Sequence, residues 1–139
     1  MTHSSKSQKC QTLRKAAEVS DTFCIVMERT GAVLASCAQF ARTPWARMRG
    51  LLGRRALPEG EALVFERCWS IHTIGMRFPI DVVFVDRAWG VVALQAGLGP
   101  GRLVPPVPNA WAVVEMREGT AARCGLAIGD RLSIIQETA

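Results

Sequence analysis

Tyrosine is absent from the sequence, and aromatic residues make up only 6% of its 139 positions. Modules dedicated to single-stranded nucleic acid stack bases on exposed aromatic side chains, so this scarcity argues against such a module. No apolar run approaches the roughly 18 residues that a membrane-spanning helix requires. The N-terminal residues also lack the apolar segment of about 7–15 residues that signal peptides contain. We therefore expect a soluble protein that stays in the cytoplasm.

Paired cysteine motifs are absent as well. The five cysteines are widely spaced and include no C-x-x-C sequence; they are Cys10, Cys24, Cys37, Cys68 and Cys124. Disulfides are rare in the reducing cytosol, where a free cysteine usually behaves as a small buried hydrophobe. We expect all five to remain thiols.

Acidic residues are missing from one basic stretch, which runs from Arg42 to Arg55 and also contains Arg47, Arg49 and Arg54. The whole chain has 17 basic and 12 acidic residues, so these five arginines account for its net charge of +5. Guanidinium groups fit phosphate oxygens well. One hypothesis is therefore a patch that binds an anion or nucleic acid, with Arg47, Arg54 and Arg55 as the anion contacts, and the alternative is a solvated arginine-rich face.

The remaining composition is that of a globular protein, with 49% hydrophobic residues and a length typical of one domain. Residues 1–20 differ, because they hold Lys, Arg, Ser, Thr and Gln with few bulky apolar side chains. Such a segment cannot bury enough surface to offset the entropy of ordering it. We predict a flexible tail over residues 1–20 and a single β-rich domain over residues 21–139.

Short apolar runs bounded by turn residues predict about seven strands. Glu28–Gly31 and Asp86–Gly90 each predict a hairpin turn. Thr43 followed by Pro44 predicts a short helix that ends by Leu52, since threonine caps free amides and proline suits the first helical position. The expected strands cover residues 22–27, 32–38, 62–68, 80–85, 91–95, 111–116 and 131–135.

Two further segments complete the expected organisation. Residues 97–109 carry three glycines and four prolines and should form a loop, while residues 120–124 should form one helical turn closed by Gly125. Strands this closely spaced favour a mostly β (α+β) fold, a small barrel-like or sandwich domain with one or two short helices.

Four ordered stretches resemble the domain-of-unknown-function 192 family, DUF192. They are Arg49–Arg54 (RGLLGR), Phe78–Asp86 (FPIDVVFVD), Val113–Glu115 with Gly119, and Gly125–Leu126 with Gly129–Asp130. The resemblance implies a small barrel-like domain with a helix near Thr43, and it supplies no established reaction. Where many members carry a Trp-Met-Lys-Asn-Thr segment, this chain has Ile71–Arg77 (IHTIGMR), which implies a His-Thr-x-Gly-Met subgroup.

The candidate site centres on His72, the one histidine of the expected domain. Histidine is the natural general base or metal ligand, and this one lies in a polar turn before a strand. Asp81 and Glu115 each interrupt an apolar strand, where a carboxylate must be paired or face a cavity. Structural ion pairing, with Arg49 or Arg77 as partner, is the preferred account of each acid.

The leading functional hypothesis is a small ligand-binding or accessory domain. Its polar cleft would be built from His72, Thr73, Met76, Asp81, Glu115 and Arg49. We expect a monomer without a cofactor, whose partner is a small molecule or a protein rather than nucleic acid or a membrane.

A second hypothesis is a small enzyme that uses His72 as a base, with Ser70 and Asp81 as in a hydrolase or with the Cys68 thiol as nucleophile. Such sites are recognised by geometry, and the sequence has no Gly-x-Ser-x-Gly motif. Cys68 and His72 would also supply only two of the three or four ligands that zinc requires, so no metal site is expected.

Overall fold

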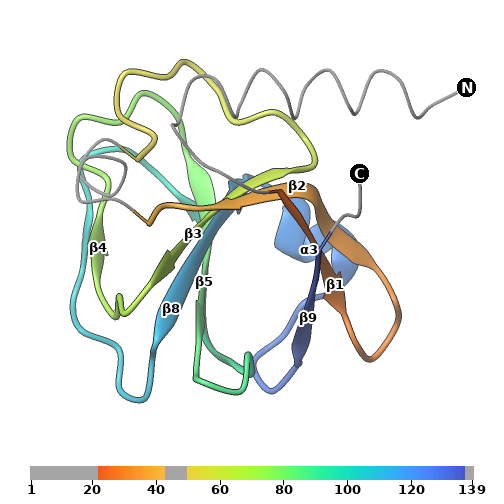
Figure 1. The fold of residues 1–139 in the computed structure, drawn as a ribbon. Helices are drawn as coiled ribbons and strands as arrows, with labels where there is room; N and C mark the ends of the chain where they lie inside the picture. Colours follow the sequence, from red (N-terminus) through yellow and green to blue (C-terminus); the bar gives the residue numbers. More distant parts are fainter. Residues whose placement is uncertain (1–21, 43–49, 137–139) are drawn as a thin grey trace, which may run out of the picture.

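The structure is a computed structural model that describes residues 22–42 and 50–136. The predicted tail and most of the predicted helix after Thr43 lie outside these residues. Nine strands and one short helix make up the described part (Figure 1). They are β1 (Phe23–Met27), β2 (Val33–Phe40), β3 (Glu61–Glu66), β4 (Ile71–His72), β5 (Ile80–Val85), β6 (Val91–Leu98), β7 (Leu103–Val104), β8 (Ala112–Arg117), α3 (Thr120–Cys124) and β9 (Leu132–Gln136).

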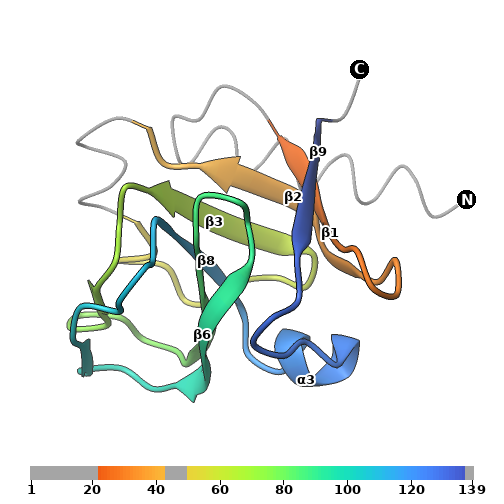
Figure 2. The ribbon, with the colours of Figure 1, turned by 90° about the horizontal axis from the view of Figure 1, so that it is seen from below.

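Seven strands form one curled sheet in the order β6-β5-β8-β3-β2-β1-β9. Neighbours are antiparallel except β2 and β3, which run parallel. The sheet curls into a half-barrel, and β1 and β9 turn across the direction of β3 (Figure 2). A bridge between Gly90 and Arg131 joins the two ends of the sheet at one point. The predicted mostly β, barrel-like fold is confirmed.

Both predicted hairpins are present. β1 and β2 pair across a turn in which the Met27 N–H donates to the Ala32 carbonyl at 2.9 Å. In the β5–β6 turn, the Asp86 carboxylate accepts hydrogen bonds from the Ala88 and Gly90 amides, both at 2.9 Å. These bonds explain why an aspartate opens the turn, because its short side chain satisfies amides that no strand can pair.

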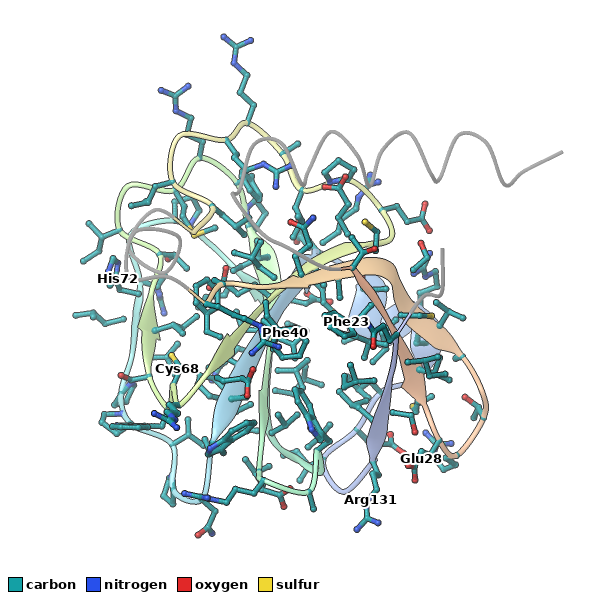
Figure 3. The ribbon with its side chains drawn as sticks, in the orientation of Figure 1. Phe23, Glu28, Phe40, Cys68, His72 and Arg131 are labelled. Atoms are coloured by element: carbon teal, nitrogen blue, oxygen red, sulfur yellow. The ribbon has the colours of Figure 1, made fainter. Side chains whose placement is uncertain are left out.

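The core consists of two main clusters, one on each face of the sheet, and β5 shows the division. Val83 and Val85 pack into the cluster inside the curl, whereas Ile80, Val82 and Phe84 pack into the cluster on the other face. Every residue of β5 is buried, as its nearly continuous apolar run requires of a strand covered on both faces. Inside the curl, the rings of Phe23 and Phe40 meet edge to face with centroids 4.9 Å apart (Figure 3).

One ion pair ties the β1–β2 turn to the start of β9. The Arg29 guanidinium donates to the two carboxylate oxygens of Asp130 at 2.8 and 3.2 Å and to the Gly125 carbonyl at 3.0 Å. The hydrogen bond from Arg29 lowers the pKa of Asp130, helped by a backbone hydrogen bond from Ala127. Beside this pair, the Glu28 N–H donates to the Arg131 carbonyl at 2.9 Å, and both residues are labelled in Figure 3.

Two segments differ from their predicted structure. The expected loop over residues 97–109 contains β7, which pairs with β4 as a separate two-stranded sheet. The expected strand over residues 91–95 continues to Leu98, because β5 still pairs with it there through the contact of Ile80 with Leu98. The helical turn over Thr120–Cys124 forms as predicted and ends at Gly125, whose φ of 68° favours glycine.

The cysteines follow the prediction only in part. Cys24, Cys68 and Cys124 form no disulfide, whereas Cys37 is disulfide-bonded, so the prediction is wrong at Cys37. A disulfide depends on which thiols the fold brings together, and sequence spacing does not reveal that. Because disulfides are rare in the cytosol, the cytoplasmic location stays a prediction. No helix within residues 22–42 and 50–136 is long and apolar enough to cross a membrane.

Candidate functional site

A pocket of about 170 Å³ opens where β4 and the segment after residue 50 cover the outer face of the sheet. Among the described residues its walls are largely apolar, with four polar side chains. These described lining residues are Gly50, Leu51, Leu52, Phe65, Cys68, Ser70, Ile71, His72, Met76 and Glu115. Three of the residues predicted for a ligand cleft, His72, Met76 and Glu115, therefore meet in one pocket.

Glu115 reaches the pocket from the middle of β8. It pairs in register with Leu63 of β3 and with Val82 of β5, so its backbone is enclosed by strands on both sides. Val82 and Val113 belong to the outer core cluster, which places the Glu115 side chain on the same outer face. Only 7% of the residue is exposed.

The Glu115 carboxyl has no hydrogen-bonding or ionic partner among the described residues, so the prediction of a structural ion pair is not met there. Water is a far better solvent for a carboxylate than the surrounding apolar side chains. Burial therefore raises the pKa of Glu115 from 4.5 to about 7. Near neutral pH, this group exchanges between a neutral acid and a buried anion.

β4 carries His72 along the outer edge of the pocket. Ile71 pairs with Val104 and His72 with Leu103, and the His72 side chain is exposed. Cys68 and His72 lie on the same side of the molecule, at β4 (Figure 3). His72 can therefore contact both a ligand in the pocket and the solvent.

Thr73 organises the loop instead of lining the pocket. It is fully buried, its hydroxyl donates to the Gly99 carbonyl at 2.6 Å, and the same oxygen accepts from the Arg102 amide at 2.9 Å. A second bond at 2.8 Å runs from the Thr73 amide to the Arg102 carbonyl. These bonds hold the segment before β7 against the segment after β4.

Asp81 lies on the other face of the sheet from the pocket. Its neighbours in β5 that share its face, Val83 and Val85, pack inside the curl. Its carboxylate accepts hydrogen bonds from the Gly97 amide and, at the start of α3, from the Ala121 amide, both at 2.9 Å. The prediction that an arginine pairs with Asp81 is therefore wrong, because two backbone amides satisfy this carboxylate.

The arrangement assembles the catalytic sets considered from the sequence only in part. Ser70 and His72 share the pocket with Cys68, but Asp81 faces away from it. The Cys68 thiol donates to the Ser70 carbonyl at 3.2 Å. No group of three or more His, Cys, Asp or Glu side chains in the described ranges is arranged to hold a metal ion.

The basic stretch is described only at its two ends, because Arg47 and Arg49 fall outside the described residues. Arg54 lies 3.3 Å from Glu61, and Arg42 lies 3.3 Å from Glu66 with its guanidinium 4.7 Å from the centre of the Phe40 ring. Arg55 is exposed. Acidic residues outside the stretch thus pair with two of the three described arginines.

Several pocket residues were missed by the analysis of the sequence. Leu51, Leu52, Phe65 and Ile71 are apolar, and an apolar residue in a sequence is normally assigned to the core. Only the fold shows that these side chains leave space between them. The pairing of β4 with β7 gave no sequence signal either, since each strand has two residues.

The fold resembles solved structures of low sequence identity. A protein of unknown function from Novosphingobium aromaticivorans DSM 12444 superposes with a TM-score of 0.69 at 24% identity, over 81% of this chain and 83% of that one. A protein provisionally named a transcription regulator, from Sinorhizobium meliloti 1021, gives a TM-score of 0.69 at 20% identity over 84% and 95% of the chains. A provisionally named exported protein from Burkholderia pseudomallei K96243 gives 0.47 at 16% identity, over 85% of this chain and 25% of that one.

No curated protein matches the chain. The family of uncharacterised ACR proteins, DUF192, matches over residues 25–134. The His-Thr-x-Gly-Met subgroup stays a prediction. The matched residues include every strand from β2 to β8, the helix α3 and the pocket-lining residues, so the match covers both the fold and the site. The chain therefore belongs to the DUF192 family.

Proposed function

We propose that this chain is a small-ligand-binding domain whose ligand occupies the pocket beside Glu115. The observation that carries the proposal is a buried carboxyl group that faces a pocket without a partner among the described residues. Buried acids are normally paired, and Asp81 in the same sheet is satisfied by two amides. A ligand that hydrogen-bonds to Glu115 would satisfy the one acid that the described part of the fold leaves unpaired on this face.

The walls indicate a compact ligand with an apolar body. Ligand sites are typically apolar concavities with a few polar groups that fix orientation, and this pocket has that composition. A closed cavity of about 150 Å³ in another protein accommodates benzene, so the present pocket suits a ligand of about that size. Leu51, Leu52 and Ile71 would contact its body, while His72 would contact the part that reaches solvent.

The other two hypotheses have less support from the geometry. The hydrolase hypothesis needs an acid oriented toward His72, and Asp81 lies on the opposite face. The anion-binding hypothesis needs free guanidinium groups, and Arg42 and Arg54 each face a glutamate.

A pair of matched substitutions tests the proposal. Leu52 is half-buried and lines the pocket, so Leu52→Trp should fill it, whereas Leu103→Trp adds the same bulk at a position that is 73% exposed and outside the pocket. Thermal shift and protein-observed NMR with benzyl alcohol, benzylamine and similar fragments measure binding. At a concentration ten times its Kd, a fragment should stabilise the wild type by about 1.4 kcal/mol.

The fragments should stabilise the wild type and the Leu103→Trp variant, and the NMR shifts should fall on residues 68–76 and near Glu115. The Leu52→Trp variant should lose the effect. If both variants respond as the wild type does, the binding site lies elsewhere and the proposal is wrong. The absence of any response to a broad fragment set would also contradict it.

A further inference from the structure

Resting on the proposed pocket, we propose that its ligand is a compact organic cation, a primary amine on a small apolar body. The inference comes from the polar groups that the described residues bring to the pocket: one acid, one thiol, one hydroxyl and one imidazole, with no Arg or Lys among the described lining residues. The thiol of Cys68 already donates to the Ser70 carbonyl. The acceptor that stays available on the sheet side is the Glu115 carboxyl.

The burial of Glu115 makes the sign of the ligand charge important. An ionised carboxylate with 7% exposure lacks most of its hydration, so an ammonium group beside it forms a charge-assisted hydrogen bond in a poorly solvated place. An alcohol of the same shape is uncharged, so its hydrogen bond to Glu115 would lack the attraction between two opposite charges. A carboxylate ligand would be repelled, or would require Glu115 to keep its proton.

The neighbours of Glu115 on the sheet fit a cation as well. Phe65 and Glu115 lie on the same face of adjacent strands, because Leu63 pairs with Glu115 and Phe65 pairs with Val113. An ammonium group at Glu115 would therefore have the Phe65 ring one diagonal step away on the same face of the sheet. The thioether of Met76 lines the same pocket and offers a polarisable surface to the ligand body.

Proton exchange accompanies the binding of such a ligand. Below neutral pH, Glu115 is mainly a neutral acid, since burial raises its pKa to about 7. Binding of an ammonium ion then converts the carboxylic acid to carboxylate and releases one proton to solvent, so the charges and atoms balance. Affinity should rise about tenfold per pH unit below pH 7 and level off above it.

Other titratable groups also lie around Glu115. Glu61 lies on the same face of β3, two residues from Leu63, and is paired with Arg54 at 3.3 Å. His72 and the Cys68 thiol line the pocket. A His72→Gln variant removes the imidazole from the pocket, so that the pH dependence it keeps can be assigned to Glu115.

The experiment is isothermal titration calorimetry of the full chain with three probes of one shape: benzylamine, benzyl alcohol and benzoate. Each has eight or nine non-hydrogen atoms, which corresponds to a Kd on the order of 1 mM for an ordinary ligand efficiency. Titrations at pH 5.5, 6.5 and 7.5, in buffers of different ionisation enthalpy, count the protons released. The Glu115→Gln and Glu118→Gln variants are compared, since Glu118 is an exposed acid three residues away.

We expect benzylamine to bind the wild type at least tenfold more tightly than benzyl alcohol at pH 7.5, with benzoate weakest. Proton release should approach one per benzylamine at pH 5.5 in the His72→Gln variant. Glu115→Gln should lose at least tenfold in benzylamine affinity and keep its affinity for benzyl alcohol, while Glu118→Gln should match the wild type.

The outcomes separate this inference from the proposed pocket. If benzyl alcohol or benzoate binds as tightly as benzylamine, with shifts at residues 68–76, the pocket binds ligands but the preference for a cation is wrong. If benzylamine binds the Glu115→Gln variant as tightly as it binds the wild type, the preference for a cation is also wrong. If none of the three probes binds at millimolar concentration, the cation proposal is wrong for this shape of ligand, and the fragment screen with Leu52→Trp decides on the pocket independently.

Discussion

Replacing Glu115 with glutamine should stabilise the protein in a strongly pH-dependent manner. The side chain is buried and unpaired among the described residues, and burial raises its pKa from 4.5 to about 7. Between these two values the folded state holds a proton that the unfolded state has released. Stability from this group is therefore complete below about pH 4.5 and is lost as the pH rises through about 7.

The size of the effect follows from the two pKa values. Each pH unit between them is worth about 1.4 kcal/mol, so the span from 4.5 to about 7 corresponds to about 3 kcal/mol. Glutamine stays neutral at every pH and keeps a similar shape. The stability difference between Glu115→Gln and the wild type should thus rise by about 3 kcal/mol from pH 4.5 to pH 8, in favour of the variant.

Urea unfolding of both proteins across pH 4.5–8 measures this difference, and the contributions of all other groups cancel in it. Glu118→Gln serves as the control, because it makes the same change at an exposed acid three residues away. A difference between Glu115→Gln and the wild type that stays constant within about 0.5 kcal/mol would refute the reasoning, since it would mean that Glu115 is ionised in the folded protein at pH 5.

Three other predictions concern stability and are checked by urea unfolding. Asp81→Ala should cost about 2–4 kcal/mol, because two amides lose their acceptor, and a loss under 1 kcal/mol would show that solvent replaces it. Arg29→Met should raise the pKa of Asp130 toward its ordinary value. The wild type loses the stability that this carboxylate contributes only in strong acid, whereas the variant should already lack it near pH 4–5. An unchanged dependence of unfolding free energy on pH in acid would contradict this. Gln39→Leu should stabilise the protein by about 1–2 kcal/mol, since Gln39 is fully buried and neither amide atom has a partner among the described residues, and destabilisation would reveal a partner.

The strands and their turns could be predicted because their signals are local. The Asp86 turn has its acceptor within four residues of its donors, and the apolar run of β5 shows directly that both of its faces are covered. The β4–β7 pair could not be predicted, because it joins Ile71 to Val104 across the whole β5–β6 hairpin and neither strand is long enough to show a period. The pocket depends on that pair, which explains why its apolar walls were missed.

Asp81 and Glu115 show where analysis of the sequence ends. Each acid interrupts an apolar strand, and the sequence gives the same choice for both, between a paired buried charge and a group that faces a cavity. The register of β5 and β8 decides, because Asp81 pairs with Met116 and Glu115 with Val82, which puts the two acids on opposite faces of the sheet. On the inner face, α3 brings the amide of Ala121 to Asp81, and the chain supplies the partner. On the outer face, the described residues line an opening and give the Glu115 carboxyl no partner, which leaves this group available to a ligand. The face on which an acid falls, rather than its place in an apolar run, thus separates a structural carboxylate from a candidate binding group.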